Sequence, residues 1–161
     1  MRIAAISDIH DNIWNLEKAL KGIAETGAEA LICCGDFCAP FSLKQIADGF
    51  EGPIHVVFGN NDGDPLPLSR VAGQYGDRVT LHGIYAELEL GGRRIAVIHY
   101  PEPARRIAQA GALDLVLYGH DHQRHAERVG RTLLANPGEV MGRWGTPTFG
   151  LYDTETGEIS H

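Results

Sequence analysis

The sequence predicts an α/β fold with a mixed sheet system, and three observations support this prediction. Apolar runs alternate with amphipathic stretches through residue 59, an order that favours parallel strands joined by right-handed crossovers. From residue 84 the pattern changes to paired runs that meet at glycine-containing turns, which indicates hairpins. No linker, low-complexity segment or internal repeat interrupts the chain, so we expect a single domain over residues 1–161.

The first half of the chain predicts three strands separated by two helices. The strands are the apolar runs Arg2 to Ser7, Ala30 to Gly35 and Pro53 to Gly59. The first helix covers Ile13 to Ile23, because Ile13, Leu16, Leu20 and Ile23 have helical spacing and Asn12 is a suitable N-cap. The second helix covers Ser42 to Phe50, with Ser42 as its predicted cap.

The second half predicts three hairpins, one helix and one more buried strand. The elements in order are a hairpin of Ile84–Leu90 with Arg93–Tyr100, a helix over Pro103–Gly111, a strand over Leu113–Gly119, a hairpin over His125–Asn136 and a hairpin over Thr148–Ser160. Gly91-Gly92, Gly130-Arg131 and Thr156-Gly157 mark the turns. We therefore expect parallel pairing early in the chain and antiparallel pairing late.

Composition and charge restrict the class of partner. Hydrophobic residues make up 43% and charged residues 22% of the chain, as in ordinary globular proteins. The net charge of -7 disfavours long nucleic acids but allows a small phosphate ester at a local cationic site. No run reaches the ~20 apolar residues of a membrane span. Three cysteines without a disulfide pattern favour a reducing cytoplasm, and a late hairpin edge leaves a homo-oligomer open.

Five predicted strands run into metal-competent side chains at their carboxyl ends. The five segments are Asp8-Ile9-His10, Gly35-Asp36, Gly59-Asn60-Asn61-Asp62, His99 and Gly119-His120-Asp121-His122. Each segment alone is weak evidence, because a single Asp after a strand is usually a helix cap or turn residue and a lone His is more often a hydrogen-bonded structural residue than a ligand. Because ligands of α/β sheets bind outside the carboxyl ends of the strands, all five segments together predict one convergent site.

The donor set predicts the kind of metal site. Seven oxygen and nitrogen donors are available, namely Asp8, His10, Asp36, Asn60, His99, His120 and His122. Seven are too many for one tetrahedral zinc ion, but they suit two ions about 3.5–4 Å apart that share a carboxylate. A mixture of carboxylate, imidazole and amide suits Mn²⁺, Fe, Ni²⁺, Co²⁺ or Zn²⁺. The lack of thiolate ligands argues against a structural zinc site.

These motifs, in this order, resemble the calcineurin-like metallophosphoesterase superfamily. The family pattern is D-x-H, G-D, G-N-H-[DE], H and G-H-x-H, and the chain has SDIH, CGDF, GNND, IHY and GHDH. The NPG that ends at Gly138 and the short chain resemble the small bacterial and archaeal phosphodiesterase branch. The resemblance implies a four-layer αββα sandwich of two mixed sheets flanked by helices. It also implies two divalent transition metal ions, with Mn the first choice.

The resemblance also implies roles for the donors. Asp8, His10, Asp36 and His122 would hold one ion, Asp36 would bridge, and Asn60, His99 and His120 would complete the second. The implied reaction is hydrolysis of a small or activated phosphodiester by a metal-bridging hydroxide held by Asp36, with Asn60 and Asn61 near the phosphate. The alternatives are a phosphomonoesterase or protein phosphatase, and a weakly active metal-binding scaffold for protein recruitment.

Two positions depart from the family pattern. Asn61 stands where the family has the His proposed as leaving-group acid, and an amide does not titrate. Because losing a general acid removes ~10²–10⁴ in rate, we expect either a preference for good leaving groups or another acid that the motifs do not identify. Tyr100 stands where Gly usually follows the metal-binding His, which makes the loop bulkier. Asn61, Asp11, Tyr100 and Arg143 are candidates for contact with substrate, although Asp11 also reads as a helix cap and Arg143 as a solvated loop residue.

Overall fold

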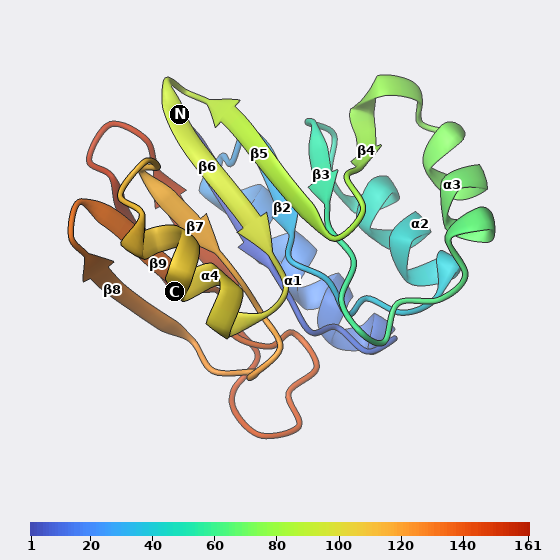
Figure 1. Cartoon of the computed structure of the whole chain (residues 1–161). Coiled ribbons are helices and arrows are strands. Elements are labelled where there is room, and N and C mark those ends of the chain that lie inside the picture. The colour runs from blue at the N-terminus through green and yellow to red at the C-terminus, as the bar shows by residue number, and fades with distance from the viewer.

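In the computed structural model, which describes residues 1–161, two sheets pack face to face between helices (Figure 1). The elements are β1 (Arg2–Ile6), α1 (Ile13–Thr26), β2 (Ala30–Cys33), α2 (Pro40–Gly49), β3 (Ile54–Val56), α3 (Pro65–Gly73), a short 3-10 helix (Gly76–Arg78), β4 (Val79–Leu81), β5 (Tyr85–Leu90), β6 (Arg93–Ile98), α4 (Pro101–Gln109), β7 (Leu115–Leu117), β8 (His125–Val129), β9 (Thr132–Asn136), β10 (Gly150–Asp153) and β11 (Glu158–Ser160).

Both sheets are mixed. The first has the order β11-β10-β1-β2-β3-β4, and the second has the order β5-β6-β7-β9-β8. In the first sheet β1 to β4 are parallel neighbours, and the C-terminal hairpin of β10 and β11 adds to β1 antiparallel. In the second sheet β6, β7 and β9 are parallel, with antiparallel strands β5 and β8 at its edges.

Three hydrophobic clusters separate the four layers. Strand β1 shows the alternation, because Ala4 and Ile6 pack under helices α1 to α3 while Ile3 and Ala5 face the second sheet. The third cluster lies between the second sheet and α4, where Val116 and Leu134 meet the helix. Strands buried on both faces explain why their sequences are continuous apolar runs. The predicted αββα sandwich is confirmed.

Helix α1 follows its sequence signals closely. The Asn12 side chain accepts a hydrogen bond from the backbone N–H of Asn15, so Asn12 is the N-cap. At the other end Gly27 has a φ of 69°, the left-handed conformation of a glycine C-cap. Leu16, Leu20 and Ile23 are buried, which orients the helix on the first sheet.

Two predictions were wrong, and one segment had no prediction. Helix α2 starts at Pro40 with Ala39 as cap, and Ser42 lies inside it with its hydroxyl donating to Asp11. Helix α3 and strand β4 lie in a segment for which no element was predicted. The late half is not wholly antiparallel either, because β7 pairs parallel with both β6 and β9.

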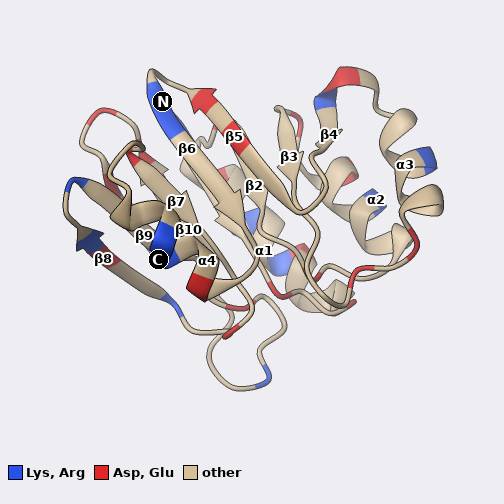
Figure 2. Ribbon diagram, in the orientation of Figure 1, with Lys and Arg blue, Asp and Glu red and all other residues tan.

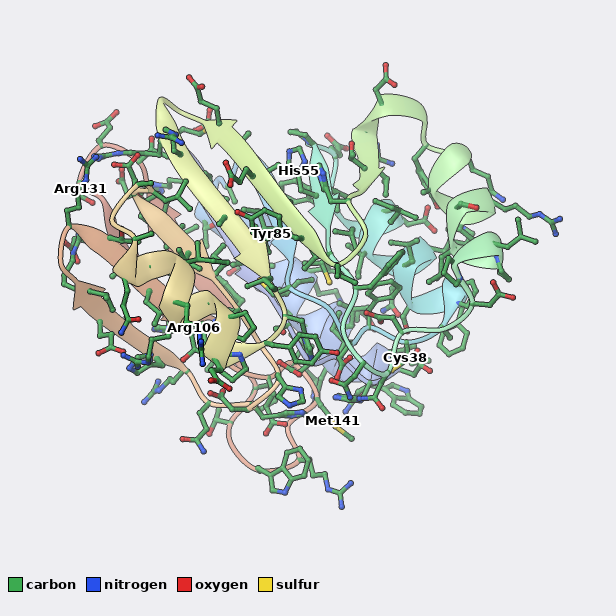
Figure 3. The ribbon with its side chains drawn as sticks, in the orientation of Figure 1. Cys38, His55, Tyr85, Arg106, Arg131 and Met141 are labelled. Carbon is green, nitrogen blue, oxygen red and sulfur yellow. The ribbon has the colours of Figure 1, made fainter.

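The carboxyl ends of the parallel strands lie together at the lower edge of the view in Figure 1. Figure 3 places Cys38 and Met141 at this end of the molecule, well away from Arg131 at the opposite end. The Met141 N–H donates to the Asp8 carbonyl, so the long loop after β9 is fastened to the loop after β1. None of the helices has the length and apolarity that a membrane crossing requires.

Candidate metal centre

The predicted donors lie together at the carboxyl ends of β1, β2, β3, β6 and β7, and two buried carboxylates form the middle of the group. Asp8 Oδ1 lies 3.4 Å from His122 Nε2 and 4.0 Å from His10 Nε2. Asp36 Oδ2 lies 3.6 Å from His10 Nε2 and 3.3 Å from His99 Nε2. The structure therefore contains two donor groups, one of Asp8, His10 and His122 and one of Asp8, Asp36 and His99.

The backbone at this centre has unusual conformations. Only seven residues other than glycine have positive φ, and five of them are predicted donors: Asp8, His10, Asp36, His120 and His122. Non-glycine residues rarely adopt the left-handed region, and each instance costs on the order of 1 kcal/mol. Such strain is typical of functional sites, where the fold holds side chains in directions that regular structure does not allow.

Two glycines allow the strand ends to approach one another. A Cβ at Gly119 would lie 2.0 Å from Ser7 Oγ and 2.8 Å from Asp8 Oδ2. A Cβ at Gly59 would lie 2.2 Å from Asp36 Oδ1 and 2.8 Å from His99 Nε2. Both positions need glycine because the Ser7 hydroxyl at Gly119 and the Asp36 carboxylate at Gly59 occupy the space that any side chain would fill.

Gly59→Ala is expected to disturb this centre without straining the backbone, because Gly59 does not have a left-handed φ. The added methyl group would displace the Asp36 carboxylate, and overpacking of this kind costs about 1–3 kcal/mol of unfolding free energy. For a chain of this size, each 1 kcal/mol lowers Tm by about 2–4 °C. Gly73→Ala is the control, because its Cβ meets nothing within 4 Å. Equal Tm values and equal Mn²⁺ affinity in the two variants would refute the close-approach argument.

Asp62 holds the loops that carry Asp36 and Asn60. Its Oδ2 accepts from the backbone N–H groups of Asp36, at 2.9 Å, and Gly59, at 2.6 Å, and its Oδ1 accepts from Cys38 N at 2.8 Å. Burial raises the pKa of Asp62, although these three amides oppose the shift. The sequence suggested a turn residue local to Asn60, whereas the structure shows a tie between two strand ends.

Asp36 is held as a charged group. Burial raises its pKa, but the neighbouring His99 ring and the hydrogen bonds from Asn61 outweigh this effect and hold the pKa well below the usual range. Asn61 donates to Asp36 twice, from its backbone N–H to Oδ1 and from its side-chain amide to Oδ2, both at 2.8 Å. Burial also raises the pKa of Asp8, and the neighbouring His99 and His122 oppose the shift.

The tautomer of His99 provides a test of whether a cation fits. His99 Nδ1 lies 2.8 Å from the Cys34 carbonyl oxygen, so this nitrogen is the donor. In the neutral ring Nε2 then carries a lone pair, and this buried atom has no hydrogen-bond partner. It faces a carboxylate oxygen of Asp36 at 3.3 Å, the separation of two ligands each about 2.1 Å from one ion. The donor chemistry therefore fits a divalent metal.

Asn60 and His120 lie at the exposed side of the centre. His120 Nδ1 and Asn60 Oδ1 are 2.9 Å apart, which again suits two neighbouring ligands of one ion. The backbone N–H of His120 donates to both Asp8 oxygens, at 3.2 and 3.1 Å. The chain thus brings together all seven side chains that the strand-end pattern selected.

Glu139 is a site residue that the sequence did not suggest. It is only 1% exposed, and its Oε2 lies 2.8 Å from His122 Nδ1. Its Oε1 accepts from the backbone N–H groups of Trp144 and Gly145, both at 2.7 Å. Burial raises the pKa of Glu139, but these donors outweigh burial and hold it below the ordinary value. A carboxylate on the far nitrogen of a metal-binding His is a common orienting device.

The candidate substrate contacts Asp11, Tyr100 and Arg143 have different surroundings in the structure. Asp11 Oδ1 accepts from Ala39 N and Ser42 Oγ at the start of α2, so Asp11 holds α2 and does not cap α1, the helix that follows it. Tyr100 packs against the rings of both His99 and His120, with centroids 5.3 and 5.2 Å away, and lines the exposed side of the centre. Arg143 is exposed, and its guanidinium lies 4.8 Å from the centroid of the Trp144 ring.

Comparison with known proteins agrees with this geometry. The family model of the calcineurin-like phosphoesterase superfamily domain matches residues 1–157. A phosphodiesterase of Methanocaldococcus jannaschii is 31% identical over 98% of this chain and 96% of that protein, and the phosphodiesterase YfcE of Escherichia coli is 25% identical over 96% and 89%.

Solved structures give the same result for the fold. An archaeal phosphodiesterase superposes with a TM-score of 0.91 at 31% identity, covering 99% of this chain and 98% of that one. The Zn²⁺ complex of Vps29 from Entamoeba histolytica, at 19% identity and a TM-score of 0.68 over 99% and 89%, shares the fold. The chain therefore belongs to the calcineurin-like phosphoesterase superfamily, whose members are metal-dependent hydrolases of phosphoric esters.

Proposed function

We propose that this chain is a phosphodiesterase that hydrolyses a small or activated phosphodiester with two divalent metal ions. The observation that carries the proposal is the buried His99 Nε2, which lacks a partner and faces the Asp36 carboxylate at 3.3 Å. Two bound cations activate water for attack on phosphorus and neutralise the charge that develops on the phosphoryl oxygens.

The position of Asp36 between His10 and His99 supports two ions that share this carboxylate. Its Oδ2 lies within 3.6 Å of His10 Nε2 and 3.3 Å of His99 Nε2, so one carboxylate oxygen reaches both sides. Asp8, His10 and His122 would complete one ion, and Asn60, His99 and His120 the other. Without thiolate ligands the set suits Mn²⁺ first and accepts Ni²⁺, Fe, Co²⁺ or Zn²⁺.

No side-chain nucleophile competes with water in this proposal. The thiol beside the donors is that of Cys38, whose Sγ lies 3.8 Å from His10 Nδ1. Burial and the neighbouring carboxylates of Asp11 and Asp62 raise the pKa of Cys38 to about 12, so its thiolate is scarce at neutral pH.

Asn61 supports the choice of an activated diester. Its amide cannot give a proton to a departing alkoxide, and both of its observed bonds orient Asp36. Substrates whose leaving groups depart without protonation therefore suit the site. The relatives named above are phosphodiesterases, which favours a diester over a monoester.

Hydrolysis of bis-p-nitrophenyl phosphate with Mn²⁺ tests the proposal. We expect turnover that EDTA abolishes, a higher kcat/KM than for p-nitrophenyl phosphate, and a steep rise in rate with leaving-group acidity across substituted phenyl esters. Faster hydrolysis of the monoester would favour a phosphomonoesterase or protein phosphatase. A fully metallated protein without turnover on any of these esters would contradict the enzymatic proposal and favour a protein-recruitment scaffold.

A further inference from the structure

A cavity of about 800 Å³ adjoins the donors on the His120 and His122 side. His120, His122, Trp144 and Thr146 line this cavity, and the last two belong to the loop between β9 and β10. The lining is mostly polar, with Trp144 as its one large apolar group. A group attached to a phosphorus atom at the donors would extend directly into this space.

Trp144 presents an exposed aromatic surface beside a predicted metal ligand. Its side chain is 67% exposed, and its ring centroid lies 4.4 Å from that of His122 at an interplanar angle of 90°. Burial of an exposed indole against another ring is favourable in free energy. Trp144 is therefore placed to contact a planar group of a ligand.

The loop that carries Trp144 is firmly anchored. The buried Glu139 carboxylate accepts from the N–H groups of Trp144 and Gly145, both at 2.7 Å. At the start of the loop the Met141 carbonyl accepts from the side chains of Asn12, at 2.9 Å, and Asn15, at 3.0 Å. The position of the indole is thus built into the fold before any ligand arrives, which lowers the entropic cost of binding.

Two arginines near the cavity have no carboxylate partner. Arg124 lines the cavity, and the Arg143 guanidinium packs 4.8 Å from the indole centroid. Neither forms an ion pair, and in this they resemble five other arginines of the chain, since only Arg93, Arg105, Arg106 and Arg128 are paired. Figure 2 shows a basic segment at the tip of this loop, below loops that carry acidic residues. In a chain of net charge -7, unpaired cations here favour an anionic ligand.

We propose that this cavity holds the non-leaving arm of the substrate and that this arm is a nucleoside, so that hydrolysis releases a nucleotide. The nucleobase stacks on Trp144, and Arg124 contacts polar groups of the arm. The inference deepens the proposed phosphodiesterase activity and rests on it. Stacking of a base on an aromatic side chain contributes about 1–3 kcal/mol, which is at least about fivefold in kcat/KM.

Two esters that share one leaving group test the proposal. Methyl p-nitrophenyl phosphate and the p-nitrophenyl ester of thymidine 5′-monophosphate both release p-nitrophenolate, so their kcat/KM ratio reports on the other arm. We expect the wild type to prefer the thymidine ester by at least about fivefold. Trp144→Ala should bring the ratio close to one, and Trp144→Phe should retain part of the preference because it keeps a ring.

Trp14→Ala is the matched control, since Trp14 is 71% exposed and does not line the cavity. It should leave the ratio unchanged. A wild-type ratio near one, or a ratio that Trp144→Ala does not change, would overturn the nucleoside assignment. Circular dichroism establishes whether each variant folds. If Trp144→Ala does not fold, Trp144→Phe still provides the test.

A binding measurement separates this inference from the proposed activity. The chain has two tryptophans, so Trp14→Phe leaves Trp144 as the single indole fluorophore. We expect thymidine 5′-monophosphate to quench its emission saturably, while deoxyribose 5-phosphate leaves it unchanged. Quenching without turnover of either ester would keep the stacking site and reject the phosphodiesterase. Turnover without saturable quenching would reject the stacking site alone.

Discussion

Asp36→Asn is expected to lower kcat/KM for bis-p-nitrophenyl phosphate by about 10³-fold or more. The substitution keeps the shape of the side chain but removes the negative charge that faces both His10 Nε2 and His99 Nε2. The cations contribute several kcal/mol to stabilisation of the transition state, and each 1.36 kcal/mol is a factor of ten. The new amide nitrogen would also face donors, because both Asp36 oxygens accept from Asn61.

Metal content gives an independent reading of the same variant. We expect Asp36→Asn to retain less than the full amount of Mn²⁺ by elemental analysis, while its far-ultraviolet circular dichroism stays that of the wild type. Asp77→Asn is the matched control, since Asp77 is exposed in the 3-10 helix. Asp36→Asn with wild-type metal content and activity within tenfold of the wild type would reject Asp36 as the shared ligand.

The donors at the strand ends could be predicted because each strand end is marked by a local change in the sequence. Each apolar run stops where a donor begins, as in Ile6 before Asp8 or Tyr118 before His120. Parallel strands point their carboxyl ends the same way, so donors far apart in sequence converge in the fold. The structure brings His122 to within 3.4 Å of Asp8, a contact that no local pattern contains.

The pairing of strands was less predictable. Strands β7, β8 and β9 follow one another in the chain, and a hairpin of β8 with β9 was correctly expected. The insertion of β9 between β7 and β8 depends on which apolar face meets α4, and Val116 and Leu134 share that cluster. Burial on both faces outweighs sequence proximity here.

Orientation of the donors could not be read from the sequence. The left-handed backbone of Asp8, His10 and Asp36 is set by the hydrogen bonds of the assembled loops, for example from Ile9 N and His10 N to the Asp36 carbonyl, both at 2.9 Å. Glu139 could not be identified from the sequence for a related reason. It stands alone after the NPG of Asn136 to Gly138, and only the fold brings its carboxylate to His122.

Glu139→Gln is expected to weaken metal binding by about 10–100-fold, the usual effect of removing the partner of a ligating His. The variant keeps the volume of the side chain. Its amide oxygen can still accept from Trp144 N and Gly145 N, as Oε1 of Glu139 does. Its amide nitrogen then faces His122 Nδ1, where Oε2 now lies at 2.8 Å. Two donors cannot share that bond, so the His122 proton moves to Nε2.

A proton on Nε2 removes the lone pair that faces Asp8 Oδ1 at 3.4 Å, and this nitrogen is the one available to a cation. The loss of affinity therefore comes from the tautomer of His122 and not from a collapsed loop. Nitrogen-15 chemical shifts of the His122 ring report the tautomer directly, and titration of the metal-free protein with Mn²⁺ reports the affinity.

Glu139→Ala separates the two functions of this carboxylate. Ala releases both His122 and the amides of Trp144 and Gly145, so we expect the loss of metal affinity together with a shift in Trp144 fluorescence. Glu139→Gln should show the first effect without the second. Glu51→Gln, at an exposed position, is the control for the charge change. Wild-type affinity and an unchanged His122 tautomer in Glu139→Gln would mean that Glu139 anchors the loop and leaves the metal centre unaffected.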